Sequence, residues 1–240
     1  MMAFTEIIAQ AECAPSAQLA ELTGPGAVLV LAPHPDDESL AMGGAIAAAS
    51  AAGHRVHVAI VTDGAKSHPK SKAYPAAALS ALRKSEVEKA VGLLTAGRET
   101  PIWLGYPDQG APDDPETFVE VEARLADLLL HVTAIWTTWN GDPHVDHQRV
   151  WRLARRIANG LGCGMFGCPV WGRVQPPLAG VSSAGLRRFQ TTSYRALKAC
   201  AVAAHASQMT GLIDDDPEGF RMPLDLAAHF VAADEIFIPA

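Results

Sequence analysis

Short apolar runs and segments of helical character alternate along most of the chain. Five runs, several of them rich in β-branched residues, have the length and composition of buried strands: 27–31, 54–62, 101–104, 134–139 and 165–170. Between them lie segments that are small and apolar or carry apolar residues at helical spacing: 39–53, 76–96, 118–131 and 146–159. This alternation predicts an α/β fold, a Rossmann-like three-layer sandwich in which helices cover both faces of a mostly parallel sheet.

The two ends of the chain depart from this alternation. Residues 1–24 predict a short amphipathic helix and a loop, which we expect to form an N-terminal arm outside the sheet. From Gly172 onward the pattern weakens, and it predicts a C-terminal elaboration over 172–240 that walls the pocket. Its expected elements are a strand at 188–192, a helix at 193–209, a helix at 224–231 and a strand at 235–238. We therefore expect one domain over residues 1–240.

Composition and charge narrow the class of partner. The chain has 240 residues, a net charge of −7 and no run of more than two Lys or Arg residues, which argues against a nucleic-acid partner. A small neutral or cationic molecule suits this balance better. The first residues lack the positive segment and apolar core of a secretory signal, and no uncharged stretch is long enough to span a bilayer. We therefore expect a cytoplasmic protein, and the oligomeric state stays open.

Two further features predict ordinary structural roles. The four cysteines lack the spacing of a zinc ribbon, and we expect free buried thiols at Cys13, Cys163, Cys168 and Cys200. The run Asp214-Asp215-Asp216 suggests a cation site, but such a run before a proline is more often a solvated turn, which is the interpretation that we adopt.

A polar turn follows the first predicted strand. Its residues, His34-Pro35-Asp36-Asp37-Glu38, bring an imidazole and three carboxylates to the carboxyl end of that strand, where ligand sites of open α/β sheets lie. So many ionisable groups would be costly there without a cation that organises them. The alternative is an ordinary turn, in which an aspartate caps the next helix and His34 has no chemical role.

A second cluster of the same chemistry follows the strand predicted at 134–139. The segment 142–147 contains His144 and His147, which are three residues apart and share a face once the helix has begun. Two His/Asp clusters at strand ends predict one shared site between neighbouring loops. A catalytic zinc ion takes three protein ligands from His and carboxylate and leaves one position for water. Two imidazoles favour zinc over magnesium, although iron, cobalt or another divalent ion could occupy such a site.

Both clusters resemble the motifs of a known family. The segments Pro33-His34-Pro35-Asp36-Asp37-Glu38 and His144-Val145-Asp146-His147 look like the two motifs of the PIG-L/LmbE family of zinc-dependent de-N-acetylases, which act on N-acetylglucosamine-type compounds. Two more segments also resemble the family, Leu104-Gly105-Tyr106-Pro107-Asp108 and Ser207-Gln208. The resemblance extends from about residue 25 to beyond residue 208.

The resemblance implies a role for each motif residue. It places the general base at Asp36 and the zinc ligands at His34, Asp37 and His147. His144 resembles a second histidine of the family, outside the metal ligands, which would hold the oxyanion and protonate the departing amine. Asp146 would hold one of the imidazoles in its tautomer.

Fewer residues point to the substrate. In relatives, positions that resemble Arg83 and Asp108 help to hold the sugar. For Arg83 an exposed helix charge is an equally good interpretation. Lys66 and His68 lie on a strand-end loop and could also reach the pocket.

The expected function is a metal-dependent hydrolase that removes an N-acetyl or longer N-acyl group from an N-acylated amino sugar or glycoconjugate. Two alternatives remain: a metal-dependent amidase with a non-sugar substrate, and a non-catalytic homologue that binds metal or sugar. The sequence lacks the Gly-x-Gly-x-x-Gly and Gly-x-Ser-x-Gly patterns, which argues against a nicotinamide cofactor and a serine hydrolase. The aglycone, the acyl length and the pathway stay open.

Overall fold

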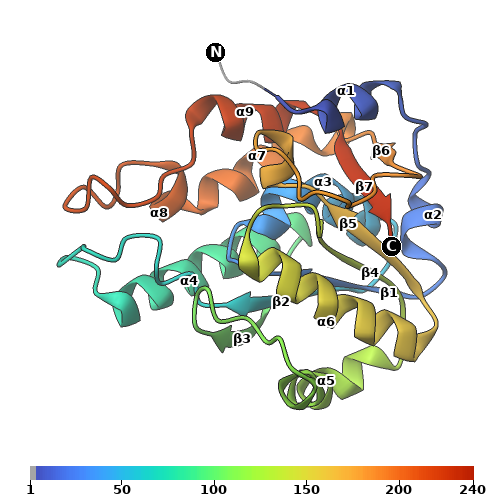
Figure 1. Ribbon diagram of the computed structural model, residues 1–240, viewed down its shortest axis with the longest axis horizontal. Helices are drawn as coiled ribbons and strands as arrows, with labels where there is room; N and C mark the ends of the chain where they lie inside the picture. Colours follow the sequence, from blue (N-terminus) through green and yellow to red (C-terminus); the bar gives the residue numbers. More distant parts are fainter. Residues whose placement is uncertain (1–3) are drawn as a thin grey trace.

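A seven-stranded sheet forms the centre of the part of the chain that the structure, a computed structural model, describes, residues 4–240. The strands stand in the order β3-β2-β1-β4-β5-β7-β6 (Figure 1). Five of them are parallel: β1 (Ala27–Ala32), β2 (Val56–Thr62), β3 (Ile102–Tyr106), β4 (Val132–Thr138) and β5 (Gly164–Cys168). The two C-terminal strands, β6 (Arg187–Phe189) and β7 (Glu235–Pro239), extend the sheet in antiparallel pairing. The predicted α/β fold with a mostly parallel sheet is confirmed.

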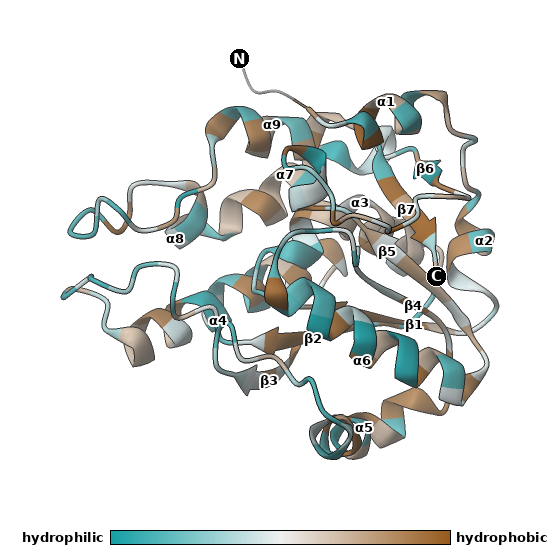
Figure 2. Ribbon diagram, in the orientation of Figure 1, coloured by the Kyte–Doolittle hydropathy of each residue, from teal (hydrophilic) through white to brown (hydrophobic). Residues whose placement is uncertain are grey.

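Helices cover both faces of the sheet, because successive residues of a buried strand point to opposite faces. In β1, Val28 and Val30 pack into one apolar layer, whereas Leu29 and Leu31 pack into the other. The first layer is completed by α2 (Leu19–Thr23), α3 (Asp37–Ala51), α4 (Ala76–Leu94), α7 (Arg195–Ala204) and α9 (Leu224–Ala232). The second is completed by α1 (Glu6–Cys13), α5 (Pro115–Leu129) and α6 (Val145–Leu161). In Figure 2 the outer side of α6 is hydrophilic, as expected for a helix that covers a sheet.

The first helix after the polar turn is enclosed almost completely. Every residue of α3 from Asp37 to Ser50 is buried, because the helix lies between the sheet and its neighbours α4 and α7. Its small side chains, mainly Ala, Gly and Ser, allow this close approach. Packing on all sides therefore holds the beginning of α3 in place. The carboxylates of its first turn are fixed in the same way.

The helix predicted at 193–209 is wrong as a single element. A short 3₁₀ turn, η2 (Thr192–Tyr194), precedes α7, and α8 (Ala206–Met209) is separate. The break falls at His205, whose ψ of 56° is not helical. The imidazole of His205 is buried, with Nε2 2.9 Å from Oε1 of Glu38, so a long-range contact accompanies the interruption of the helical pattern.

The N-terminal arm contains two short helices, α1 and α2, where the sequence predicts one. Residues 1–3 of that predicted arm lie outside the described residues. Ile7 and Ala11 of α1 are buried against the second layer, whereas Leu22 of α2 is buried against the first. No helix in residues 4–240 combines the length and hydropathy that a membrane crossing requires.

The predictions for the four cysteines and for the aspartate run at 214–216 need correction. The four thiols are free, but only Cys168 is buried, while Cys13 and Cys200 are exposed. The aspartate run is not simply a solvated turn. Asp215 accepts hydrogen bonds from Ser71 Oγ at 2.7 Å and from two backbone N–H groups of the same loop, and the carboxylate of buried Asp216 accepts from the N–H of Lys70 at 2.8 Å. These aspartates join the loop before α4 to the loop before α9.

Candidate metal and catalytic site

The strand order brings the two His/Asp clusters together. β1 and β4 are neighbours in the parallel sheet, so the segments that follow Ala32 and Thr138 leave it at the same edge. The ring centroids of His34 and His144 lie 4.6 Å apart, and those of His144 and His147 lie 5.0 Å apart. Segments more than 100 residues apart in the sequence thus build one compact group of imidazoles and carboxylates.

The carboxylate of Asp37 lies between two imidazoles. Its Oδ2 is 3.2 Å from Nδ1 of His34 and 3.4 Å from Nε2 of His147. Burial alone would raise the pKa of Asp37, but the nearby His147 and His34 outweigh burial and hold this pKa well below its ordinary value. The group therefore keeps its negative charge, as a metal ligand must.

The imidazole of His147 is oriented by a second carboxylate, from Asp142. Nδ1 of His147 donates to Oδ2 of Asp142 at 2.8 Å, and both side chains are fully buried. Burial lowers the pKa of His147, but Asp37 and Asp142 raise it to about 9, and with Nδ1 committed to Asp142, Nε2 is the ring nitrogen that a cation would take in place of a proton. Nε2 of His147 is buried and has no hydrogen-bond partner among residues 4–240. A buried ring nitrogen without a partner, beside a charged carboxylate, fits a cation that would complete the site.

Two three-residue groups have donor atoms close enough to share an ion. One comprises His34, His144 and His147, and the other comprises His34, Asp108 and Asp146. His34 belongs to both, since its Nδ1 faces Asp37 and its Nε2 lies 3.2 Å from Oδ2 of Asp146. Burial lowers the pKa of His34, but the three aspartates around it raise this pKa well above its ordinary value. The donor set of imidazoles and carboxylates suits zinc or a similar divalent ion.

Asp146 and Asp108 both lie near Nε2 of His34, the ring nitrogen that does not face Asp37. Asp146 accepts hydrogen bonds from the backbone N–H groups of Gln109 at 2.7 Å and Ala111 at 3.1 Å, so the helix start is tied to the loop after β3. Oδ1 of Asp108 lies 3.6 Å from Nε2 of His34. Burial opposes ionisation of Asp108, but His34 lowers its pKa to about 2. Both aspartates are therefore turned towards His34.

Asp36 sits in a strained turn beside a buried arginine. Its φ of 153° is unusual for a residue other than glycine, and α3 begins at the next residue. Oδ2 of Asp36 lies 3.2 Å from Nη2 of Arg83. Burial raises the pKa of Asp36 to about 6 against the opposing effect of Arg83. Asp36 is thus a carboxylate at the cavity whose proton affinity is raised by its surroundings.

Arg83 is not an exposed helix charge, so that interpretation is wrong. Its side chain is almost fully buried, and its two Nη groups donate to the carbonyls of Gly64 at 2.9 Å and Pro35 at 2.7 Å. The guanidinium therefore joins the polar turn after β1 to the loop after β2. A side chain at position 64 would collide with it, which adds to the positive φ of 61° that favours glycine there.

His144 caps α6 and also faces the cavity. Its Nδ1 accepts a hydrogen bond from the backbone N–H of Asp146 at 3.2 Å. Burial lowers the pKa of His144 to about 4, and the neighbouring His34 and His147 lower it in the same direction. With Nδ1 used as an acceptor, the ring carries its proton on Nε2 and is a donor.

A cavity of about 230 Å³ opens beside these groups. Its polar lining comprises the site residues together with Lys66, Ser67 and Gln109. Its apolar lining comprises Leu40, Val170, Trp171, Phe220 and Met222. The last part of the chain thus contributes to the cavity wall. Lys66 lines the cavity, whereas His68 is buried beside it, with Nδ1 3.1 Å from Oγ of Ser67.

Sequence reasoning assigned no role to several buried polar residues around the site. Asp142 is the partner of His147, and Glu86 accepts two hydrogen bonds from Ser207. Asp142 stands inside the second cluster, so its position five residues before His147 was a usable signal. Glu86 shares the predicted helix face with Arg83, at a spacing of three residues, but its partner lies 121 residues away.

The family of the chain follows from its motifs. Residues 29–158, more than half of the chain, match the family model PIG-L, described as GlcNAc-PI de-N-acetylase. The chain belongs to this family, and the resemblance seen in the sequence is confirmed. None of the curated protein sequences matches the chain significantly.

Solved structures with this fold include enzymes of two reaction types. N,N'-diacetylchitobiose deacetylase from Pyrococcus horikoshii has 24% identity and a TM-score of 0.66, over 89% of this chain and 83% of that chain. The A40926 pseudoaglycone deacetylase Dbv21 has 21% identity and a TM-score of 0.65, over 89% and 96%. The hydratase GalB from Pseudomonas putida KT2440 has 18% identity and a TM-score of 0.63, over 76% and 80%. At these identities the similarity establishes the fold, and the site residues must decide the chemistry.

Proposed function

We propose that this protein is a metal-dependent N-deacetylase that hydrolyses the N-acyl group of an amino sugar or glycoconjugate. The observation that carries the proposal is the buried, unpaired Nε2 of His147 beside the charged carboxylate of Asp37, at a cavity that also exposes a second carboxylate, Asp36. A cation site with an adjacent base is the arrangement that amide hydrolysis by water needs.

His34, Asp37 and His147 are the residues that we propose as metal ligands. A divalent ion held by them would supply Lewis-acid activation of water and of the acyl carbonyl. The protein's own contribution is orientation: Asp142 holds the imidazole of His147, and Asp146 faces the far nitrogen of His34. Both histidines are thereby kept in one tautomer and one ring position.

Asp36 is the proposed general base. It lines the cavity next to Asp37, and its Oδ2 is held by Arg83, which is itself anchored on two backbone carbonyls. Asp36 takes a proton from the attacking water as the new C–O bond forms at the acyl carbon. When the C–N bond breaks, the proton that Asp36 took from water passes on to the amine nitrogen, and the carboxylic acid and the free amine leave.

His144 is the proposed donor to the oxyanion. Its Nδ1 is used to cap α6, so Nε2–H is available on the cavity side. A neutral imidazole N–H in this position would stabilise negative charge on the carbonyl oxygen as it develops. The cap is an additional structural role, so replacement of His144 is expected to affect both stability and turnover.

An amino-sugar substrate is favoured by the family and by the cavity. The family model carries the name of a GlcNAc-PI de-N-acetylase, and the two deacetylases with this fold are named for a diacetylated chitobiose and an antibiotic pseudoaglycone. The lining of the cavity combines apolar side chains with polar ones that include Asp108 and Arg83, a combination that suits a sugar ring. A hydratase shares this fold, so the fold does not fix the reaction, and the assignment must be tested with substrates.

Release of acetate from a panel of N-acetylglucosamine glycosides, measured with zinc-loaded protein, tests the proposal. Asp36→Asn is expected to retain the metal and to lose turnover by about 10²–10⁴-fold, because it removes only the base. Asp37→Asn and His147→Ala are expected to lose metal occupancy, measured by elemental analysis of the purified variants.

Three outcomes would contradict this assignment. An Asp36→Asn variant that emptied the site while Asp37→Asn retained the ion would exchange the two roles. Metal-loaded wild-type protein that released no acetate from any glycoside, but hydrolysed other N-acyl compounds, would favour an amidase with a non-sugar substrate. Binding of the glycosides without turnover would indicate a non-catalytic homologue.

A further inference from the structure

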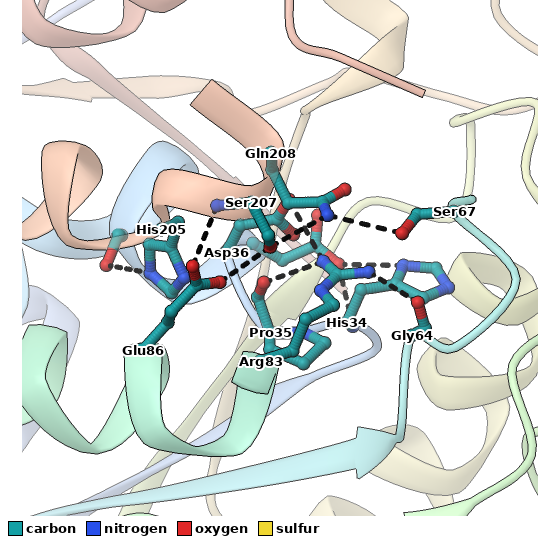
Figure 3. A network of polar contacts seen from close by, with 12 residues as sticks. His34, Pro35, Asp36, Gly64, Ser67, Arg83, Glu86, His205, Ser207 and Gln208 are labelled. Carbon is teal, nitrogen blue, oxygen red and sulfur yellow. Dashed lines mark hydrogen bonds and ion pairs between the residues drawn. The ribbon is translucent and has the colours of Figure 1, made fainter. Parts of the chain in front are cut away.

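The side chain of Gln208 is a buried amide whose NH₂ group is hydrogen-bonded and whose carbonyl oxygen has no hydrogen-bond partner among the described residues. Gln208 lies on α8 (Figure 3). It is fully buried and contributes to the cavity wall. Its Nε2 donates to Oγ of Ser207 at 3.0 Å and to Oγ of Ser67 at 3.2 Å. Its Oε1 has no hydrogen-bond partner among residues 4–240. The cavity wall therefore contains a buried acceptor that residues 4–240 do not satisfy.

The orientation of this amide is imposed by Glu86. The backbone N–H of Ser207 donates to one carboxylate oxygen of Glu86 at 2.7 Å, and the hydroxyl of Ser207 donates to the other, also at 2.7 Å (Figure 3). Because the hydroxyl proton is used by Glu86, Oγ of Ser207 can only accept from Gln208. The NH₂ group must then face Ser207, and the carbonyl oxygen must face away from it.

Ser67 acts on the amide in the same direction. Its Oγ lies 3.1 Å from Nδ1 of His68, a ring whose pKa is lowered by burial and which is therefore a neutral acceptor on one nitrogen. In the tautomer that leaves Nδ1 of His68 unprotonated, Ser67 donates to that nitrogen and accepts from Gln208. Ser207, whose proton is already used by Glu86, faces the amide from its NH₂ side, so an exchange of the amide oxygen and nitrogen would set the amide oxygen against a hydroxyl oxygen that has no proton to donate.

The remaining groups near this end of the cavity do not satisfy the oxygen. Trp171, Phe220 and Met222 form the apolar wall contributed by the last part of the chain, and the backbone N–H of Met222 is used by the carbonyl of Gln208 itself. A buried carbonyl left without a donor is unfavourable, so this position is prepared for a donor that arrives with a ligand.

We propose that Gln208 is a specificity-determining residue, whose Oε1 accepts a hydrogen bond from a ring hydroxyl of the substrate, and that Glu86 is the positioning residue that sets the direction of the amide. The inference rests on the proposed function in that the substrate is an amino sugar. A compound that lacks the hydroxyl leaves the acceptor unpaired and is rejected.

The test pairs variants with deoxy substrates. The compounds are the methyl glycoside of N-acetylglucosamine and its 3-, 4- and 6-deoxy analogues, and the protein is wild type or Gln208→Leu. Two quantities are measured: kcat/KM of zinc-loaded protein, and the Kd of each compound for metal-free protein by calorimetry. For wild type, one deoxy analogue is expected to be about 10- to 100-fold poorer than the parent in both quantities. In Gln208→Leu the same pair is expected to differ by less than about threefold.

Glu86→Gln tests the positioning role without touching the cavity lining. The N–H of Ser207 can only donate, so the new amide must keep its oxygen there and turn its NH₂ to the hydroxyl of Ser207. That hydroxyl is then free to donate to Gln208, and the enforced direction is lost. The preference for the hydroxyl is expected to fall at least about fivefold. Glu88→Gln, on the exposed side of α4, is the matched control and should keep the full preference.

The outcomes separate this inference from the proposed function. A deoxy penalty that is the same in wild type and in folded Gln208→Leu, as judged by an unchanged melting temperature, would overturn the role of Gln208. A penalty that vanishes in Gln208→Leu but persists in Glu86→Gln would overturn the role of Glu86. Protein that hydrolyses no compound but still shows the Gln208-dependent difference in Kd would reject the deacetylase and keep the recognition of the hydroxyl.

Discussion

At the level of single residues, Asp142 orients a proposed metal ligand without being a ligand itself. Its two carboxylate oxygens accept from Nδ1 of His147 at 2.8 Å and from the backbone N–H groups of Val170 at 3.0 Å and Gly172 at 2.7 Å. All three partners are donors, and a carboxylate is the side chain with acceptors on both oxygens. The same residue therefore orients the imidazole and holds the start of η1 (Trp171–Arg173) against the cavity.

Replacement of Asp142 by Asn should weaken metal binding. The amide would turn an NH₂ group towards at least one donor, so either His147 or the backbone loses its acceptor. We expect the affinity for zinc to fall by about 10- to 100-fold, measured by competition with a chelator. Asp127→Asn, on the exposed side of α5, is the control and should bind zinc like wild type. Unchanged affinity with a lower melting temperature would reduce Asp142 to a structural role.

At the scale of elements, the buried helix α3 depends on glycine at one contact. Gly44 faces Thr191, and a Cβ atom at this position would lie 2.5 Å from Cγ2 of Thr191. The backbone N–H groups of Gly44 and Ala45 donate to the carboxylate of Glu235 at 2.6 and 2.8 Å, and Lys198 lies 2.6 Å from the same carboxylate. Strand β7 and helix α7 are thereby joined to the middle of α3.

Alanine substitutions at two helical glycines should have opposite effects on stability. Gly44→Ala introduces a collision in a closed layer and should lower the free energy of unfolding by about 1–3 kcal/mol. Gly92→Ala, on α4, meets no atom within 4 Å and should raise it by about 0.5–1 kcal/mol, because alanine is the better helix former. Urea unfolding measures both. A neutral Gly44→Ala would show that α3 can shift away from Thr191.

At the scale of the whole molecule, His229 joins segments from both ends of the chain. Its ring centroid lies 4.3 Å from that of Phe4, and its Nε2 lies 3.2 Å from Nη1 of Arg173. Burial lowers the pKa of His229 to about 4, and the positive charges of Arg173 and Lys198 lower it in the same direction. The folded protein thus binds a proton at this site less readily than the unfolded chain does.

This difference predicts a loss of stability in acid. Since the folded pKa of His229 is about 4 and the unfolded value is about 6.5, its contribution is complete above pH 6.5 and is lost as the pH falls towards 4. His229→Gln keeps an acceptor for Arg173 but does not titrate. Denaturant unfolding from pH 7 to 4 should therefore show wild type losing more stability than the variant. Parallel curves over this range would exclude a contribution from His229.

Local patterns in the sequence predicted the framework of the fold and the pairing of His34 with Asp37. Apolar runs and helical periods are local properties, and they predicted the parallel strands and the helices between them to within a few residues. His34 and Asp37, three residues apart in one turn, could be expected to act together because the chain between them is too short to separate them. The same local logic failed where a distant contact competes with it, as at His205, where the helical pattern continues but the helix does not.

The partners of the buried polar groups could not be predicted from the sequence, because they come from distant parts of the chain. Arg83 could not be assigned from its helix, because its partners are the carbonyls of Pro35 and Gly64, 48 and 19 residues away. The direction of the Gln208 amide depends on a carboxylate 121 residues from Ser207, which orders the protons between them. Hydrogen bonds between buried groups are set by packing and by the need to satisfy every donor, and neither is a local property of the chain.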